Sequence, residues 1–149
     1  MILKIFLILL WSSLMLVQAD MAKTQKVVVK VSNIEVKRGG DIIVFIFGKE
    51  GYPKVHDKAL LMQRKSVSTN VMEFTFDMAV DEMAIKVLHD ENGDGKVTKD
   101  WTGIMPKDGL GFSNNQRISI TGLPTYKKSK LSIGDIKKEV EIALRYKIL

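Results

Sequence analysis

A polar loop at residues 89–96 carries the densest run of oxygen-bearing side chains in the sequence. Counted from Asp90, Asn92 and Asp94 take the third and fifth positions, and Gly95 takes the sixth. This is the first part of the pattern D-x-[DN]-x-[DN]-G, in which alternate side chains of a tightly curled loop point at one calcium ion. Glycine at the sixth position permits the positive φ that reverses the backbone. The spacing therefore predicts a calcium-binding loop.

The remaining ligands are expected from the residues after the glycine. Lys96 at the seventh position offers a backbone carbonyl, and Thr98 at the ninth offers a hydroxyl or holds a water. The twelfth position, normally a bidentate glutamate, is Trp101, so the last carboxylate must come from Asp100, Asp108 or elsewhere. With so few carboxylates we expect weak calcium binding, with a dissociation constant of about 10⁻⁴ to 10⁻³ M. The predicted metal ligands are Asp90, Asn92, Asp94, Lys96, Thr98 and Asp100.

The same residues also support an ion-free turn. Asn92-Gly93 and Asp94-Gly95 are common hairpin-turn dipeptides. An aspartate-rich turn can satisfy its own backbone through side-chain hydrogen bonds and bind nothing. The flanking segments are typical of strand and loop rather than of two helices, so an EF-hand is excluded. Both interpretations of the loop stay open at this point.

The sequence lacks the common catalytic motifs. There is no G-x-S-x-G elbow, Walker loop, HExxH or dinucleotide fingerprint, and no cysteine for a disulfide, a thiolate site or a nucleophile. His56 and His89 are the only imidazoles. We expect His56 to be solvated, and His89 to end a strand and hydrogen-bond to the loop. No catalytic residue is predicted, and the alternative is a hydrolase that uses the acidic loop with His89.

Short strands with turn residues between them dominate the rest of the chain. Residues 42–47 are apolar throughout, which predicts a central strand covered on both faces. In the strand at 83–88 we expect alternate residues from Met83 to face inward and Lys86 to face outward. Residues 99–124 are expected to form a long irregular connection, which is usually functional. The other expected strands are 26–36, 71–78, 131–133 and 139–146, with 59–62 either a helical turn or a short edge strand.

These elements predict an all-β protein, an antiparallel β-sandwich of about seven strands, with a small barrel as the rival. Residues 1–19 show the layout of a secretory signal peptide: Lys4, an apolar run too short to span a bilayer, and small residues before Asp20. We therefore predict a signal peptide at 1–19, a single sandwich domain at 20–149, no membrane span after cleavage, and a secreted or periplasmic location. Because the domain has no disulfides, its core must hold it together.

The charge balance is modestly basic. Removing residues 1–19 removes only Lys4 among the charges, so the net charge falls from +6 to +5. The basic residues are scattered apart from a cluster at 127–130, which is expected to be a solvated strand edge. We expect no nucleic-acid partner and a monomer.

The loop and a second motif carry a family resemblance. The second motif runs through Gly103-Ile104, Pro106-Lys107-Asp108-Gly109 and Gly111-Phe112-Ser113-Asn114-Asn115. Together they resemble an uncharacterised family of bacterial secreted domains with an H-D-x-N-x-[ND]-G-K segment followed by G-I-P-x-E-G-Y-G-F-S-N-N. The resemblance covers roughly residues 27–146 and implies an immunoglobulin-like or transthyretin-like sandwich outside the cytoplasm, with no established activity. Here Met105 is inserted, Asp108 and Leu110 replace the usual Glu and Tyr, and a usual Asp near Thr98 is missing.

We expect the segment 109–115 to fold back against the Asp90 loop, where it would either complete the coordination of the ion or brace the loop. The alternative is that Asn114 and Asn115 only cap turns in a long loop. The functional hypothesis is a non-enzymatic, calcium-organised sandwich with a structural or binding role toward a protein or glycan at the cell envelope. The alternatives are the hydrolase and an ion-free protein-interaction domain.

Overall fold

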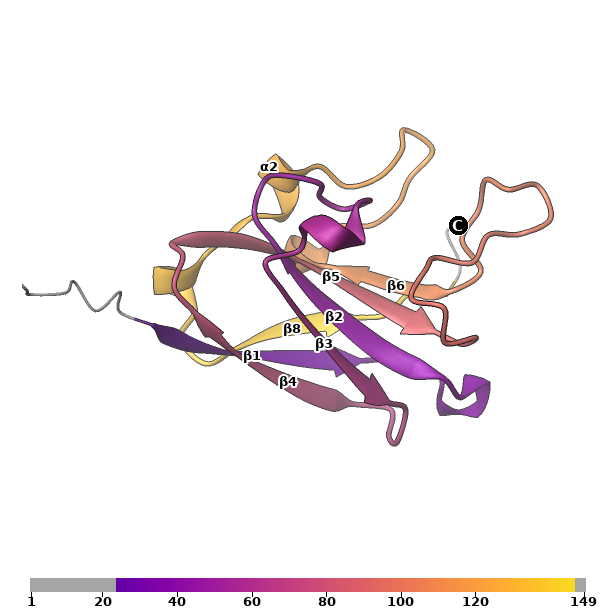
Figure 1. Ribbon diagram of the computed structural model, residues 1–149, viewed down its shortest axis with the longest axis horizontal. Coiled ribbons are helices and arrows are strands. Elements are labelled where there is room, and N and C mark those ends of the chain that lie inside the picture. The colour runs from indigo at the N-terminus through magenta and orange to yellow at the C-terminus, as the bar shows by residue number, and fades with distance from the viewer. Residues whose placement is uncertain (1–23, 147–149) are drawn as a thin grey trace, which may run out of the picture.

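Two β-sheets pack face to face in the computed structural model, which describes residues 24–146 (Figure 1). The predicted signal peptide, 1–19, lies outside the described residues. One sheet has the strand order β4-β1-β8 and the other β3-β2-β5-β6, with β7 paired to β5. The strands are β1 (Gln25–Ser32), β2 (Asp41–Phe47), β3 (Leu61–Ser66), β4 (Met72–Met78), β5 (Glu82–Asp90), β6 (Gly109–Phe112), β7 (Leu131–Ser132) and β8 (Glu139–Ala143).

The predicted all-β sandwich is confirmed. Every strand pair is antiparallel except β1 with β8, which run parallel with Val29 opposite Val140. A parallel pair needs a long crossover connection, and here almost the whole domain lies between the two strands. The terminal strands of the domain therefore lie side by side in one sheet.

The main core lies between the two sheets and is formed by alternate residues of the strands, which point to the same face of a sheet. In β4 the burial alternates strictly, so Met72, Phe74, Phe76 and Met78 face the other sheet. In β5, Met83, Ile85 and Val87 point into the same core, as predicted. Burial of this apolar surface is the main stabilising term in a domain without disulfides.

A second, smaller core covers the outer face of the larger sheet. Six buried side chains form it: Ile43, Phe45, Phe47, Leu88, Leu110 and Phe112. Strands β2 and β5 are consequently buried on both faces, as predicted for 42–47. Lys86 faces outward from the main core, as predicted, but this outer face is itself covered, so only 4% of the residue is exposed.

Two local expectations change with the tertiary structure, and a third is resolved. Residues 99–124 are not irregular throughout, because 109–112 pair with β5 as strand β6. Residues 127–130 are not a strand edge: Lys127 and Lys128 lie exposed on the short helix α2 (Tyr126–Ser129). The region around 59–62 enters the edge strand β3, one of the two options considered.

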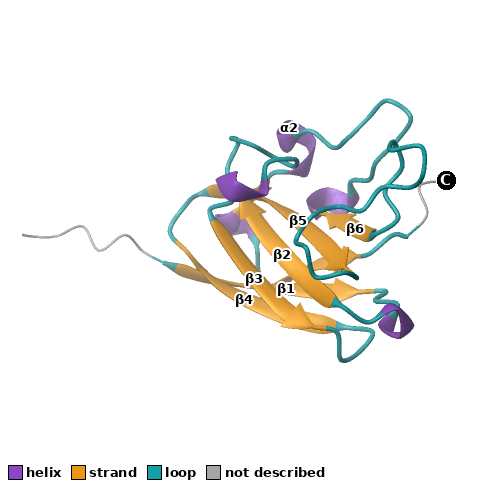
Figure 2. Cartoon of the chain, turned by 45° about the vertical axis from the view of Figure 1, so that its right-hand side comes forward, coloured by secondary structure: helices purple, strands orange, loops and turns teal. Residues whose placement is uncertain are grey.

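Short 3-10 turns join several strands, and the longer loops gather on the side of β5 and β6 (Figure 2). These turns are η1 (Val36–Arg38), η2 (His56–Lys58), η3 (Ser113–Asn115) and η4 (Ile133–Asp135). Within residues 24–146, no helix has the length and apolar character needed to cross a membrane.

Candidate functional site

Strand β5 continues into the polar loop and ends at Asp90. The Asp90 side chain is fully buried. Its Oδ1 accepts a hydrogen bond from the backbone N–H of Gly93 at 3.0 Å, and its Oδ2 accepts one from Gly95 at 2.8 Å. Both glycines have positive φ, which is what lets the loop curl around the carboxylate. Asp90 thus organises the loop from inside.

A guanidinium balances the charge of this buried carboxylate. Arg64 extends from β3 and places Nη2 3.3 Å from Asp90 Oδ2 and Nη1 3.1 Å from Asp41 Oδ2. The same Nη1 lies 3.4 Å from the carbonyl oxygen of Gly93. One side chain therefore ties the loop to two neighbouring strands of the larger sheet.

The other predicted calcium ligands hold turns of their own. Asp94 accepts a hydrogen bond from the backbone N–H of Lys96 at 2.8 Å, and the Asn92 amide donates to Asp94 Oδ2 at 3.1 Å. Asp100 accepts from the N–H groups of Thr102 and Met105, so it caps the turn that follows it. Within the described part of the chain, no three carboxylate, imidazole or thiol side chains gather to hold a metal ion. The calcium site stays a prediction.

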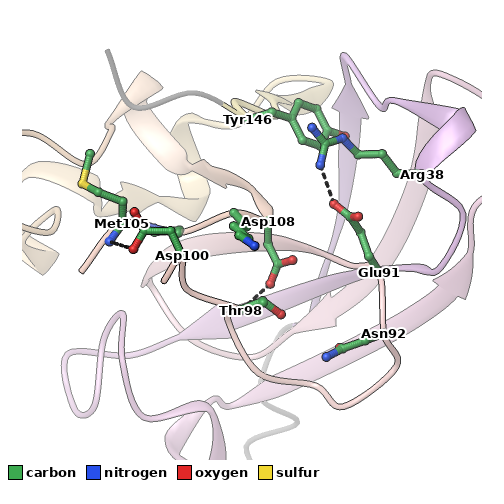
Figure 3. A pocket seen from close by; sticks show the side chains of 10 residues that line it. Arg38, Glu91, Asn92, Thr98, Asp100, Met105, Asp108 and Tyr146 are labelled. Atoms are coloured by element: carbon green, nitrogen blue, oxygen red, sulfur yellow. Dashed lines mark hydrogen bonds and ion pairs between the residues drawn. The ribbon is translucent and has the colours of Figure 1, made fainter. Parts of the chain in front are cut away.

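Asp108, rather than Asp100, braces the far end of the loop. Its Oδ2 accepts a hydrogen bond from the Thr98 N–H at 2.5 Å. The side chain lines a hollow of about 660 Å³ with Arg38, Glu91 and Tyr146 (Figure 3). Burial raises the pKa of Asp108, and the negative charges of Glu91 and Asp90 add to this effect.

The rim of this hollow is held by an ion pair. Arg38 Nη1 lies 2.7 Å from Glu91 Oε1, and the guanidinium stacks 4.7 Å from the centre of the Tyr146 ring (Figure 3). With Arg38 neutralising one carboxylate, the hollow mixes both signs of charge. It offers no uniform field for either an anion or a cation.

His89 points into the sheet interior, and its ring contacts groups outside the polar loop. The residue is fully buried, with Nδ1 2.7 Å from the Tyr146 hydroxyl and Nε2 2.6 Å from the carbonyl oxygen of Gly39. The expected hydrogen bond to the loop is replaced by these two contacts. Both ring nitrogens are engaged and no solvent reaches them, so His89 is not placed to act as a general base.

The two sequence motifs meet only at their ends. Gly109 pairs with His89 across β5 and β6, but β6 then runs away from the loop. The Asn114 amide donates to the carbonyls of Lys128 and Lys130, and the Asn115 side chain accepts from Arg145. The asparagines therefore do not complete the loop; they hold the turn around α2 and the end of the chain.

A groove of about 770 Å³ lies over the outer face of the larger sheet, where sequence reasoning placed nothing. Its walls come from the segments around 53–56, 96–106 and 118–123, and its floor from β5 and β6. The apolar residues that line it are Pro53, Val97, Ile104, Met105, Pro106, Leu110, Phe112, Ile118, Ile120 and Leu123.

Lys86 and His56 lie together in the lining of this groove. The ammonium of Lys86 is 2.9 Å from the carbonyl oxygen of Pro53 and 2.7 Å from His56 Nε2. On the other side of the ring, His56 Nδ1 lies 3.0 Å from the carbonyl oxygen of Gly95. Because a carbonyl can only accept, Nδ1 carries the proton and Nε2 accepts from the lysine. The hydrogen bond from His56 Nδ1 to the Gly95 carbonyl oxygen joins the groove to the polar loop.

Packing holds His56 in this position. Its ring stacks on Phe45, with centres 4.1 Å apart and planes 24° from parallel. The expectation that His56 is solvated was therefore wrong; the ring is half-buried because the turn that carries it lies back on the outer core. Burial, followed by the positive charge of Lys86, lowers the pKa of His56.

The charged side chains that line the groove are positive. Among the described residues that line it are four lysines, Lys54, Lys86, Lys96 and Lys99, and no carboxylate. Burial lowers the pKa of Lys86 to about 8. The sequence held a signal for this site, namely a single lysine inside the otherwise apolar run 83–88, where a solvated strand face would carry several polar residues.

Comparison with known proteins adds a family. Residues 29–141 match the model of DUF2141, described as an uncharacterised protein conserved in bacteria. Neither the search of curated proteins nor the search of solved structures found a match.

Proposed function

We propose that this chain, which belongs to the DUF2141 family of uncharacterised bacterial proteins, is a non-enzymatic ligand-binding domain that acts outside the cytoplasm. The observation that carries the proposal is the apolar groove over the larger sheet. Concave, largely apolar surfaces with a few polar groups at their base are the usual form of small-molecule sites, at about 300–1,000 Å³. The groove, at about 770 Å³, has that size and composition.

The lining favours an apolar ligand over a glycan. Ile104 and Ile120 line the groove and are 74% and 99% exposed, so covering them would remove apolar surface from water. Of the lining residues within 24–146, Phe112 is the only tyrosine, tryptophan or phenylalanine, and it is buried and offers no open face on which a sugar ring could stack. A glycan at the cell envelope, considered from the sequence, thus fits less well than an apolar envelope component.

The chemistry of the two histidines supports binding rather than catalysis. Both ring nitrogens of His56 and of His89 are within hydrogen-bond distance of groups of the protein. Neither imidazole is left as a base for a substrate. The signal-peptide layout of residues 1–19 supports a location outside the cytoplasm.

The test is titration of the ¹⁵N-labelled mature chain with decanol, an uncharged apolar probe. We expect amide shifts confined to the groove, and a several-fold weaker affinity in an Ile104→Asp, Ile120→Asp double variant. Trp101 is 94% exposed and does not line the groove, so Trp101→Asp is the matched control. Shifts spread over the whole surface, or an equal loss in the Trp101 variant, would contradict the proposal.

A further inference from the structure

We infer that the ligand of the groove carries a carboxylate head on an apolar body, and that Lys86 binds this head at the base of the groove. The inference rests on the proposed function, since it names the chemistry of the ligand that the groove would take. Three observations support it: the unused hydrogen-bonding capacity of Lys86, the absence of a counter-charge, and the apolar walls beyond it.

The first observation is the coordination of the Lys86 ammonium. A protonated lysine has three N–H donors. One lies toward the Pro53 carbonyl oxygen at 2.9 Å and one toward His56 Nε2 at 2.7 Å. Both partners are neutral acceptors, and they fix the position of the nitrogen. The third donor is left for a group that enters the groove, which Lys86 itself lines.

The second observation is that the buried charge is uncompensated. Within residues 24–146, every ion pair involves other groups, and none includes Lys86. An isolated buried ammonium is costly unless a partner neutralises it. A ligand with a single negative charge at its head would supply that partner without introducing a new unpaired charge.

The third observation concerns the body of the ligand. Phe112 pairs with Lys86 in register across β5 and β6, and Leu110, Ile118, Ile120 and Leu123 line the same groove. A small hydrophilic anion would leave this surface exposed. An alkyl or aryl carboxylate would cover it while its head reaches the ammonium.

The surrounding charges act in the same direction. Lys54, Lys96 and Lys99 line the groove, so an approaching anion meets a positive field. The titratable groups near the base are His56, which contacts Lys86, and Asp57, whose charge reaches His56. Because burial lowers the pKa of Lys86 to about 8, the ammonium is lost between pH 7 and pH 10 while ordinary surface lysines keep their charge.

The experiment compares three probes that share a ten-carbon alkyl chain: decanoate, decanol and decyltrimethylammonium. Their binding to the mature protein is measured at pH 7 by calorimetry and by amide chemical shifts. A charge-assisted hydrogen bond in a buried site predicts that decanoate binds at least about ten-fold more tightly than decanol. The cationic probe should bind more weakly than decanol. Equal affinities for decanoate and decanol would overturn the inference and leave the groove as a binding site. No binding of any probe would overturn both the inference and the proposed function.

Variants assign the effect to one lysine. Lys86→Met should remove the preference for decanoate over decanol and leave decanol binding within about two-fold, because a methionine fills the same space without charge. Lys54 also lines the groove but is exposed, so Lys54→Met should keep most of the preference. An unchanged preference for decanoate over decanol in the Lys86→Met variant would contradict the inference. If that variant does not fold, the pH profile of the unmodified chain decides: decanoate affinity must fall between pH 7 and pH 10 while decanol affinity stays constant.

Discussion

The Nζ atom of Lys86 lies 2.7 Å from Nε2 of His56, although the two residues are 30 positions apart in the sequence. Lys86 comes from the middle of strand β5, and His56 from a turn that folds over the outer face of the sheet. The contact places a positive charge under an apolar groove and links that groove, through Gly95, to the polar loop.

The free energy of unfolding should rise with pH in the alkaline range. Burial lowers the pKa of Lys86 to about 8, whereas an unfolded lysine titrates near its usual 10.5. Between these values the unfolded chain binds more protons than the folded one, so stability increases with pH. Between pH 7.5 and pH 10 the gain attributable to Lys86 is about 2 kcal/mol. Urea unfolding at pH 7.5 and pH 10 measures it.

Lys86→Met serves as the reference for that measurement, because tyrosines and other lysines also titrate in this range. The variant lacks the penalty of a buried charge, so it should be more stable than the unmodified chain at pH 7.5. The difference between the two proteins should shrink or reverse by pH 10. Parallel stability curves across this range would show that Lys86 keeps an ordinary pKa.

Asp90→Ala should destabilise the domain by about 2–4 kcal/mol. The change leaves the N–H groups of Gly93 and Gly95 and the guanidinium of Arg64 without their shared acceptor. Asp94→Ala is the matched control, because that side chain is exposed and should contribute less than about 1 kcal/mol. Urea unfolding of both variants tests this, and equal losses would argue against Asp90 as the centre of the loop.

Calcium binding by the loop predicts a higher unfolding temperature in calcium than in chelator. Ligand linkage predicts a stabilisation of about 1–3 kcal/mol at roughly 10 to 100 times the dissociation constant. The shift should vanish in an Asp90→Asn, Asp94→Asn double variant. Since Arg64 already contacts Asp90 at 3.3 Å, a calcium ion would have to compete with its guanidinium. No shift in the unmodified chain would leave the loop as an ion-free turn.

Gly111→Ala should destabilise the protein by about 1–3 kcal/mol through steric conflict. A Cβ at this position in β6 would lie 2.6 Å from Ile142 Cγ2 and 3.2 Å from the Ala143 carbonyl oxygen. Gly134→Ala is the control, because nothing lies within 4 Å of its added Cβ and its φ is not positive. Thermal unfolding should separate the two variants clearly. A neutral Gly111→Ala would mean that β6 and β8 can move apart without loss.

Strand periodicity explains why so much of the fold was predictable. The alternation in residues 71–78 and the apolar run at 42–47 each depend only on local sequence, and both strands appear as expected. The tight curl of the Asp90 loop was also predictable, because its glycine and Asx positions act over a few residues. A calcium site at this loop would also need ligands from further along the chain, and spacing alone cannot place these.

The sequence by itself determined the elements and the local turn chemistry, since both follow from backbone sterics and short-range hydrogen bonds. Only the tertiary structure decided which polar residues are buried. Lys86 stands among apolar neighbours in the run 83–88, which is a local sign of its burial, whereas His56 lies in a polar segment that gives no such sign. What buries both is the packing of β6 and of the 53–56 turn on the outer face of the sheet. Burial of this kind arises from contacts between segments distant in the chain, so the groove itself became visible only in three dimensions.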